Sequence, residues 1–122
     1  MYADSTYYTE SYGGDTIPPK ALEKSLRKAS RHIDTLTFNR IESMERLTEF
    51  QQEIVREVCC EMADFEYENA ETLGSILQSY SINGVSMTFG EGLNARVIDG
   101  VVIRRDTYGL LCQTGLCCRL QR

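Results

Sequence analysis

The chain has 122 residues, 42% of them hydrophobic and 25% charged, which indicates one soluble globular domain with a single modest core. Its formal net charge of −5 argues against a free-standing nucleic-acid binder, because such a protein needs a basic surface to neutralise phosphates. The N-terminus has no apolar signal-peptide segment, and the uncharged run from Thr72 to Gly90 is too polar to span a membrane. We therefore expect a soluble protein with no membrane contact.

Residues 1–16 form an arm that is rich in tyrosine and ends at Gly13-Gly14. A glycine pair marks a turn, so the chain should change direction before the first helix. The tyrosines either anchor an extended arm on the core or reach a neighbouring subunit, and we favour the first interpretation. They are Tyr2, Tyr7, Tyr8 and Tyr12.

The segment that follows the arm predicts a helix that ends near Leu36. Pro18 and Pro19 have the fixed backbone angle that suits a first helical turn, and Thr16 or Asp15 can cap it. On a helical wheel, one face is apolar and holds Leu22, Leu26, Ala29, Ile33 and Leu36. The opposite face is basic and holds Lys20, Lys24, Arg27, Lys28 and Arg31.

A second helix should begin after Thr48 and run to about Tyr67. Thr48 and Gln51 have the spacing of a capping box. The apolar positions are Leu47, Ile54, Val55, Val58, Met62 and Phe65, and the acidic positions on the other side are Glu49, Glu53, Glu57, Glu61, Asp64 and Glu68. Cys59 lies at the margin of the apolar face, and Cys60 falls toward the polar side.

The two helices therefore carry opposite charges on their outward faces. If their apolar faces pack together, the charged faces point away from each other, and they are either solvated or meet between molecules. In the second case the basic face of one copy meets the acidic face of the next, and the contact closes into a ring or continues into a filament. The residues assigned to this subunit interface are Lys24, Arg27, Lys28 and Arg31 with Glu53, Glu57 and Glu61.

Two weaker elements follow. Asn83-Gly84 predicts a type I′ turn within a β-hairpin over residues 79–89, and an isolated hairpin needs a surface to cover it. We assign Ile82, Val85 and Met87 of its apolar face to the subunit interface as well. From Val97 to Cys112 the apolar spacing predicts a helix, although Val101 to Ile103 could be extended, and Gly115 should lie at the C′ position.

Together these elements predict a mainly α fold: a small helical bundle of two long amphipathic helices and a shorter C-terminal helix, with one β-hairpin. It forms a single domain, with an arm (1–16), a helical core (17–112) and a terminal segment (113–122) that is either frayed or a docking tail. We find no catalytic constellation, and we expect His32, between the two faces of its helix, to hydrogen-bond to a neighbour. We therefore predict neither an enzyme nor a cofactor.

Five cysteines in a chain without an export signal predict reduced thiols. The Cys-Cys pair at 59–60 and the Cys112, Cys117 and Cys118 group lack the CxxC spacing of structural zinc sites. We expect buried or half-buried thiols that act as small apolar side chains, and no metal site.

Four ordered pieces of this sequence resemble the head–tail connector (head-completion adaptor) family of tailed bacteriophages. They are Tyr12-Gly13-Gly14 followed by Ile17-Pro18, the segment ASRHID at 29–34, the segment LTFNRI at 36–41, and Thr114-Gly115-Leu116 with Arg119. The character of residues 79–89 also matches. Cys117-Cys118 departs from the pattern, because relatives tend to have larger apolar or aromatic residues there.

The resemblance implies a structural protein of the virion neck that is present in the host cytoplasm during assembly. Its copies form a homo-oligomeric ring, commonly twelvefold, beneath the portal of the filled capsid. Such a ring extends the DNA channel without sequence-specific DNA binding and supports the downstream head-closure or tail protein. In relatives the C-terminal segment engages the portal protein, which implicates Leu116, Cys117, Cys118, Arg119 and Leu120.

Two other functions remain open from the sequence. One is a small cytosolic regulatory or DNA-associated helical protein that uses the basic face of its first helix. The other is a thiol or metal sensor built on the five cysteines. On the connector interpretation, the acidic face of the second helix has two competing uses, which are the contact with the next subunit and the lining of the channel.

Overall fold

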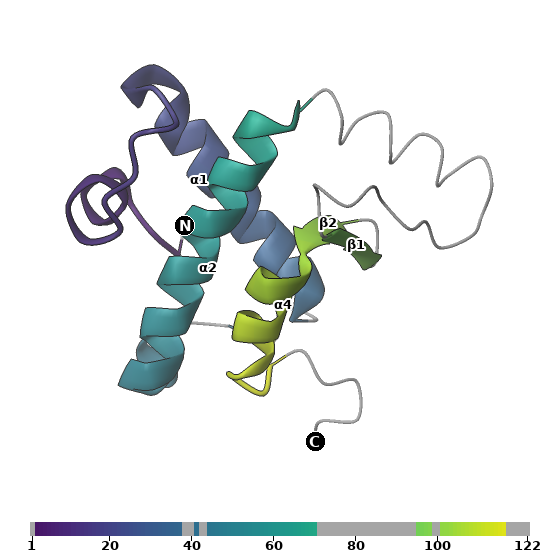
Figure 1. Cartoon of the computed structure of the whole chain (residues 1–122). Coiled ribbons are helices and arrows are strands. Elements are labelled where there is room, and N and C mark those ends of the chain that lie inside the picture. Colours follow the sequence, from purple (N-terminus) through teal and green to yellow (C-terminus); the bar gives the residue numbers. More distant parts are fainter. Residues whose placement is uncertain (1, 38–40, 42–43, 71–94, 99–100, 117–122) are drawn as a thin grey trace.

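The computed structural model describes residues 2–37, 41, 44–70, 95–98 and 101–116, and these residues form a mainly helical bundle, as the sequence predicts (Figure 1). The helices are α1 (Pro19–Leu36), α2 (Glu49–Glu68) and α4 (Arg105–Cys112), and the strands are β1 (Ala95–Ile98) and β2 (Val101–Arg104). Two short helical turns, η1 (Tyr7–Ser11) and η2 (Met44–Arg46), complete the description. The predicted hairpin at 79–89 lies outside the described residues.

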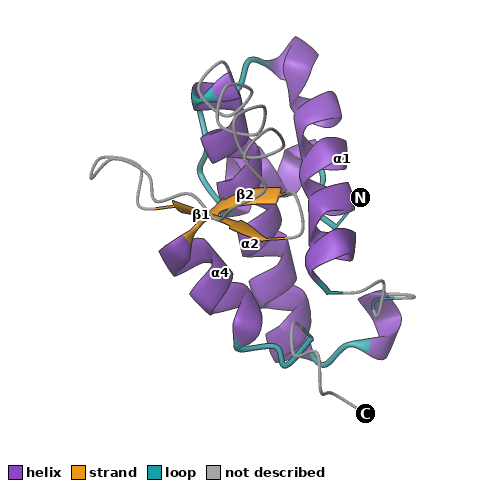
Figure 2. Ribbon diagram, turned by 90° about the vertical axis from the view of Figure 1, so that its right-hand side faces the viewer, coloured by secondary structure: helices purple, strands orange, loops and turns teal. Residues whose placement is uncertain are grey.

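Helix α2 is the centre of the bundle. It packs against α1 on one side and against α4 on another, while β2 contacts all three helices (Figures 1 and 2). Helices α1 and α2 run in opposite directions, so the start of α1 and the start of α2 lie toward opposite ends of the bundle (Figure 1). The N-terminal arm lies along α2 (Figure 1).

Helix α1 has the boundaries and the apolar face that the sequence predicts. Its buried residues include all five predicted apolar positions and also Ser30. Pro19 is the first helical residue, and the helix ends at Leu36. Its cap differs from the prediction: Pro18 occupies the N-cap position and no side chain bonds there, so neither Thr16 nor Asp15 serves as the cap.

Helix α2 begins with the predicted capping box. The Gln51 backbone N–H donates to the Thr48 hydroxyl at 3.1 Å, and the Thr48 backbone N–H donates to the Gln51 side-chain oxygen at 3.0 Å. The buried surface of α2 is broader than the predicted apolar face, because it includes Cys60 and Glu66. The expected position of Cys60 on the polar side is therefore a correction: the thiol is buried.

The N-terminal arm lies beside Cys60, whereas Glu66 pairs with His32 of α1. Tyr8 is fully buried in the core, and Tyr2, Tyr7 and Tyr12 pack against it, which confirms that the tyrosines anchor the arm on the core. The arm is not extended, because it contains the turn η1. Gly13 has a φ of +76°, and the Gly14 backbone N–H donates to the Tyr8 carbonyl at 2.8 Å, so the glycine pair makes the predicted turn.

The helix predicted from Val97 to Cys112 is wrong in its first half. Strands β1 and β2 form an antiparallel pair in which Ile98 is opposite Val101, and helix begins only at Arg105. The run Val101-Val102-Ile103 is β-branched, and all three side chains are buried. An extended backbone accommodates such a run better than a helix does. Gly115 adopts the left-handed conformation expected of it, with φ +78°, but one position later than C′.

Candidate interaction surfaces

The basic face of α1 points away from the bundle. Its five cationic residues are all exposed: Lys20, Lys24, Arg27, Lys28 and Arg31. Arg27 pairs with Glu23 of the same helix at 2.8 Å. This exposed ion pair contributes little to stability, about 0–1 kcal/mol. The surface is a row of charges one helical turn apart, available for a partner of opposite charge.

The acidic face of α2 is divided into two parts. Its first half remains exposed and holds Glu49, Glu53 and Glu57, a set that we call the exposed acidic row. In the second half, Glu61 accepts a hydrogen bond from the Thr107 hydroxyl of α4 at 3.0 Å, and Asp64 accepts one from the Tyr8 hydroxyl at 2.5 Å. Glu61 and Asp64 are half-buried within the monomer, in contrast to the solvated face expected for them.

Two arm tyrosines donate hydrogen bonds, as neutral phenols, to Glu53 and Asp64 of α2. The Tyr7 hydroxyl donates to Glu53 at 3.1 Å, and the Tyr8 hydroxyl also accepts a bond from the Ile17 backbone N–H at 3.2 Å. Burial, followed by the hydrogen bond to a carboxylate, raises the pKa of Tyr7 and of Tyr8 to about 12. The phenols thus keep their protons at neutral pH and hold the arm on α2.

The surroundings of Glu61 also differ from the solvated face that the sequence predicts. Burial raises the pKa of its carboxyl, and the charges of Glu57 and Asp106 act in the same direction, against the lowering effect of the hydrogen bond from Thr107. Ionised Glu61 is therefore less favourable than an exposed carboxylate. Its position inside the fold makes it a poorer contact for another subunit than Glu53 or Glu57.

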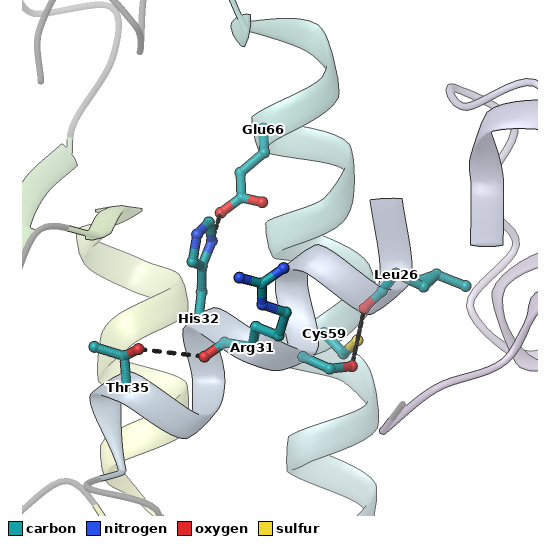
Figure 3. A network of polar contacts seen from close by, with 7 residues as sticks. Leu26, Arg31, His32, Thr35, Cys59 and Glu66 are labelled. Carbon is teal, nitrogen blue, oxygen red and sulfur yellow. Dashed lines mark hydrogen bonds and ion pairs between the residues drawn. The ribbon is translucent and has the colours of Figure 1, made fainter. Parts of the chain in front are cut away.

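His32 makes the contact to a neighbour that its boundary position predicts. Its Nδ1 pairs with Glu66 of α2, where the side chains are 28% and 9% exposed (Figure 3). Within the described part of the chain, the second carboxylate oxygen of Glu66 has no hydrogen-bond partner. Glu66 is not among the residues predicted from the sequence, and it lies four residues after Met62 on the apolar side of the helix. An acidic residue on an apolar face was the signal for a buried partner.

The described cysteines are dispersed. Cys59 lies against the Leu26 carbonyl, with Sγ at 3.6 Å from the carbonyl oxygen (Figure 3). The same Sγ is 3.4 Å from the Ser30 hydroxyl oxygen. Burial raises the pKa of both the Cys59 and Cys60 thiols, whereas Cys112 is exposed. Among the described residues, no group of three or more His, Cys, Asp or Glu side chains is placed to hold a metal ion.

The predicted docking tail begins at the end of the described chain. Leu116 is half-buried and packs against the core, and the Gln51 side chain donates to the Thr114 carbonyl at 2.9 Å. This bond ties the turn after α4 to the start of α2. The other predicted docking residues, Cys117 to Leu120, lie outside the described residues, as do the hairpin residues Ile82, Val85 and Met87.

Sequence reasoning also missed an exposed aromatic residue and a hollow. Phe50, in the first turn of α2, is 60% exposed. A hollow of about 470 Å³ lies between the arm and the start of α1, and its lining includes Tyr8, Ile17, Pro19 and Leu22.

No protein-family model, curated protein or solved structure matches this chain. Within the described ranges, no helix is long and apolar enough to cross a membrane.

Proposed function

We propose that this protein is a structural virion subunit that forms a ring beneath the portal, extends the DNA channel and joins the filled capsid to the neck or tail. The observation that carries the proposal is the separation of two exposed, oppositely charged surfaces on a bundle whose apolar faces are buried within one monomer. Two surfaces of this kind favour a heterologous contact between copies, which generates rings or filaments. The four sequence pieces that resemble phage connectors favour the ring.

The two charged surfaces have matching periods. Lys20, Lys24 and Lys28 recur every four residues along α1, as do the three glutamates of the exposed acidic row along α2. Four residues of helix rise about 6 Å, so the lysines of one copy match the glutamates of another in spacing. Each exposed pair contributes about 0–1 kcal/mol, so the charges set the orientation and apolar contacts must hold the assembly.

The covered part of α2 narrows the earlier assignment of interface residues. The seam keeps the three lysines of α1 with Glu53 and Glu57. It leaves Glu61 out, because Glu61 is half-buried and bonded to Thr107 within the monomer, whereas Glu53 and Glu57 remain exposed. Each copy also brings a net charge of −5, so a ring of any size is acidic and repels the DNA backbone. DNA then moves through the channel without being bound.

Charge reversal tests the seam. The variant Lys24→Glu with Lys28→Glu should weaken assembly, and so should Glu53→Lys with Glu57→Lys. A mixture of the two variants should assemble better than either alone, because each supplies the surface that the other lacks. Sedimentation velocity at low and high salt measures this, with wild-type protein as the reference. If all four samples assembled equally and independently of salt, the charged seam would be wrong.

The docking tail has a separate test. Deleting residues 117–122 removes the segment beyond Leu116 and should leave the described fold intact, while attachment to portal-containing capsids is lost. Circular dichroism checks the fold, and co-sedimentation with capsids checks attachment. A truncated protein that still completes capsids would show that the tail is not the portal contact.

The exposed basic face of α1 favours one alternative, a small helical protein that binds DNA through Lys24, Lys28 and Arg31. The net charge of −5 weighs against it. A DNA-binding protein would bind duplex DNA with an affinity that falls steeply with salt, and it would have no requirement for portal protein. Fluorescence anisotropy with a labelled duplex over a range of salt concentrations separates the two functions.

A further inference from the structure

Phe50 has the features of an anchor residue for a protein contact. It is a large aromatic side chain, 60% exposed in the first turn of α2, and Glu53 and Glu57 lie on the same side of the helix one and two turns further on. Aromatic residues in the centre of an interface often supply most of its binding energy, whereas charged residues at the rim set specificity. Phe50 and the exposed acidic row beside it have this arrangement of one aromatic side chain next to charged ones.

The hollow between the arm and α1 is a complementary surface on the same molecule. Its lining is largely apolar on the α1 side, where Ile17, Pro18, Pro19 and Leu22 contribute. Its volume of about 470 Å³ leaves room for a phenyl ring. The basic face of α1 begins beside it, because Lys20 follows Pro19 directly and Lys24 is one turn further on. On the arm side, the exposed Asp15 also lines the hollow.

Phe50 cannot fill the hollow of its own copy. The Tyr8 hydroxyl bonds both to Asp64 of α2 and to the Ile17 backbone, so the hollow lies beside Asp64. Asp64 is 14 residues after Phe50, which corresponds to about 21 Å along the helix. The anchor and the hollow thus lie far apart on one monomer, which is the condition for a heterologous contact between copies.

We propose that Phe50 of one copy inserts into the hollow between the N-terminal arm and the start of α1 of the next copy, with Glu53 and Glu57 facing Lys20 and Lys24. A second copy is the occupant because the two surfaces belong to the same chain, match in charge, and lie where they cannot satisfy each other within one monomer. This inference deepens the proposed ring: it supplies the apolar contact that the charged seam requires.

Photo-crosslinking tests the contact directly. Phe50→p-benzoylphenylalanine is introduced into full-length protein, and ¹⁴N-labelled and ¹⁵N-labelled copies are mixed, assembled and irradiated. Mass spectrometry after trypsin digestion should find position 50 joined to peptide 1–20 or 21–24 of a copy with the other isotope label. Crosslinks from position 50 to any other peptide of a second copy, or none to a second copy in assembled rings, would overturn the proposal.

Matched substitutions measure the energetics. Phe50→Ser should raise the dissociation constant of the assembly by about tenfold or more, the effect expected for exposing one buried aromatic ring. Tyr67→Ser is the control, because Tyr67 is 43% exposed near the other end of α2 and should leave assembly within about twofold of wild type. Phe50 is exposed in the monomer, so the thermal transition should not change.

A reciprocal substitution tests the hollow. Thr6→Trp adds bulk at an exposed position of its lining and should weaken assembly as Phe50→Ser does, and combining the two should add little further loss. Additive effects would show that Phe50 and the hollow do not meet.

If Phe50→Ser assembled like wild type, or formed rings but lost portal attachment, this proposal would fail while the ring function stood. Wild-type protein that stays monomeric with and without portal would overturn both.

Discussion

Replacing Gly14 by alanine tests how the N-terminal arm is held on the bundle. An added Cβ would lie 2.3 Å from Tyr8 Cζ, and 2.6 and 2.8 Å from Cε1 and Cε2 of the same ring. Carbon atoms in contact are separated by about 3.5–4.0 Å, so the ring or the chain must move. Tyr8 is fully buried and its hydroxyl is bonded to Asp64 and Ile17, so a shift of the ring would disturb both hydrogen bonds. We expect a loss of about 1–3 kcal/mol, the usual cost of overpacking.

Gly13 supplies the matched control. A Cβ at Gly13 would meet nothing within 4 Å, but its φ of +76° is a left-handed conformation that costs alanine about 1–2 kcal/mol. Gly13→Ala and Gly14→Ala therefore destabilise the fold for different reasons. The substitution Tyr8→Leu separates them, because it removes the three ring atoms that the new Cβ would meet.

Urea unfolding monitored by circular dichroism measures the free-energy cost of each glycine substitution in the wild-type and in the Tyr8→Leu background. In the Tyr8→Leu background, the cost of Gly14→Ala should fall below about 0.5 kcal/mol, whereas the cost of Gly13→Ala should stay the same. If Gly14→Ala cost the same free energy in both backgrounds, the Tyr8 ring would not be the obstacle.

Three further outcomes follow from the buried polar groups. Burial raises the pKa of Glu61, so the folded state holds this proton more tightly than the unfolded chain does. The contribution of Glu61 to the free energy of unfolding should be fully present below about pH 4.5 and should be lost as the pH rises through the folded pKa. In urea unfolding at several pH values, Glu61→Gln should abolish this loss, and an unchanged pH profile would contradict it. His32→Ala leaves Glu66 buried without its partner and should cost about 1–3 kcal/mol by the same assay, whereas His32→Leu with Glu66→Leu should cost less. Native iodoacetamide labelling with peptide mapping should modify the exposed Cys112 and reach Cys60 only on unfolding, so equal labelling rates would show that the arm does not cover α2.

The sequence predicted the features that depend on local pattern. The start of α2 at its capping box, the end of α1 at Leu36 and the apolar face of α1 follow from residues within a few turns of one another. The β-branched run 101–103 was the one local signal whose helical interpretation was wrong, because packing on the bundle favours its extended form.

The features that the sequence missed arise from contacts between distant segments. Cys60 and Asp64 face outward on an isolated α2, and both are covered because the tyrosine arm, more than fifty residues earlier, folds over them. The partnership of His32 with Glu66 joins two helices and has no spacing signal of its own. Phe50 falls by its spacing on the side of Glu53 and Glu57, and the packed bundle leaves it 60% exposed within the monomer.

Negative-stain microscopy of the full-length protein, alone and mixed with portal protein, tests whether it assembles into a closed ring that attaches to a portal. We expect rings, free or stacked on the portal, that carry the channel forward. A monomer or dimer under both conditions, together with duplex DNA binding that weakens steeply with salt, would contradict it and favour a DNA-associated helical protein.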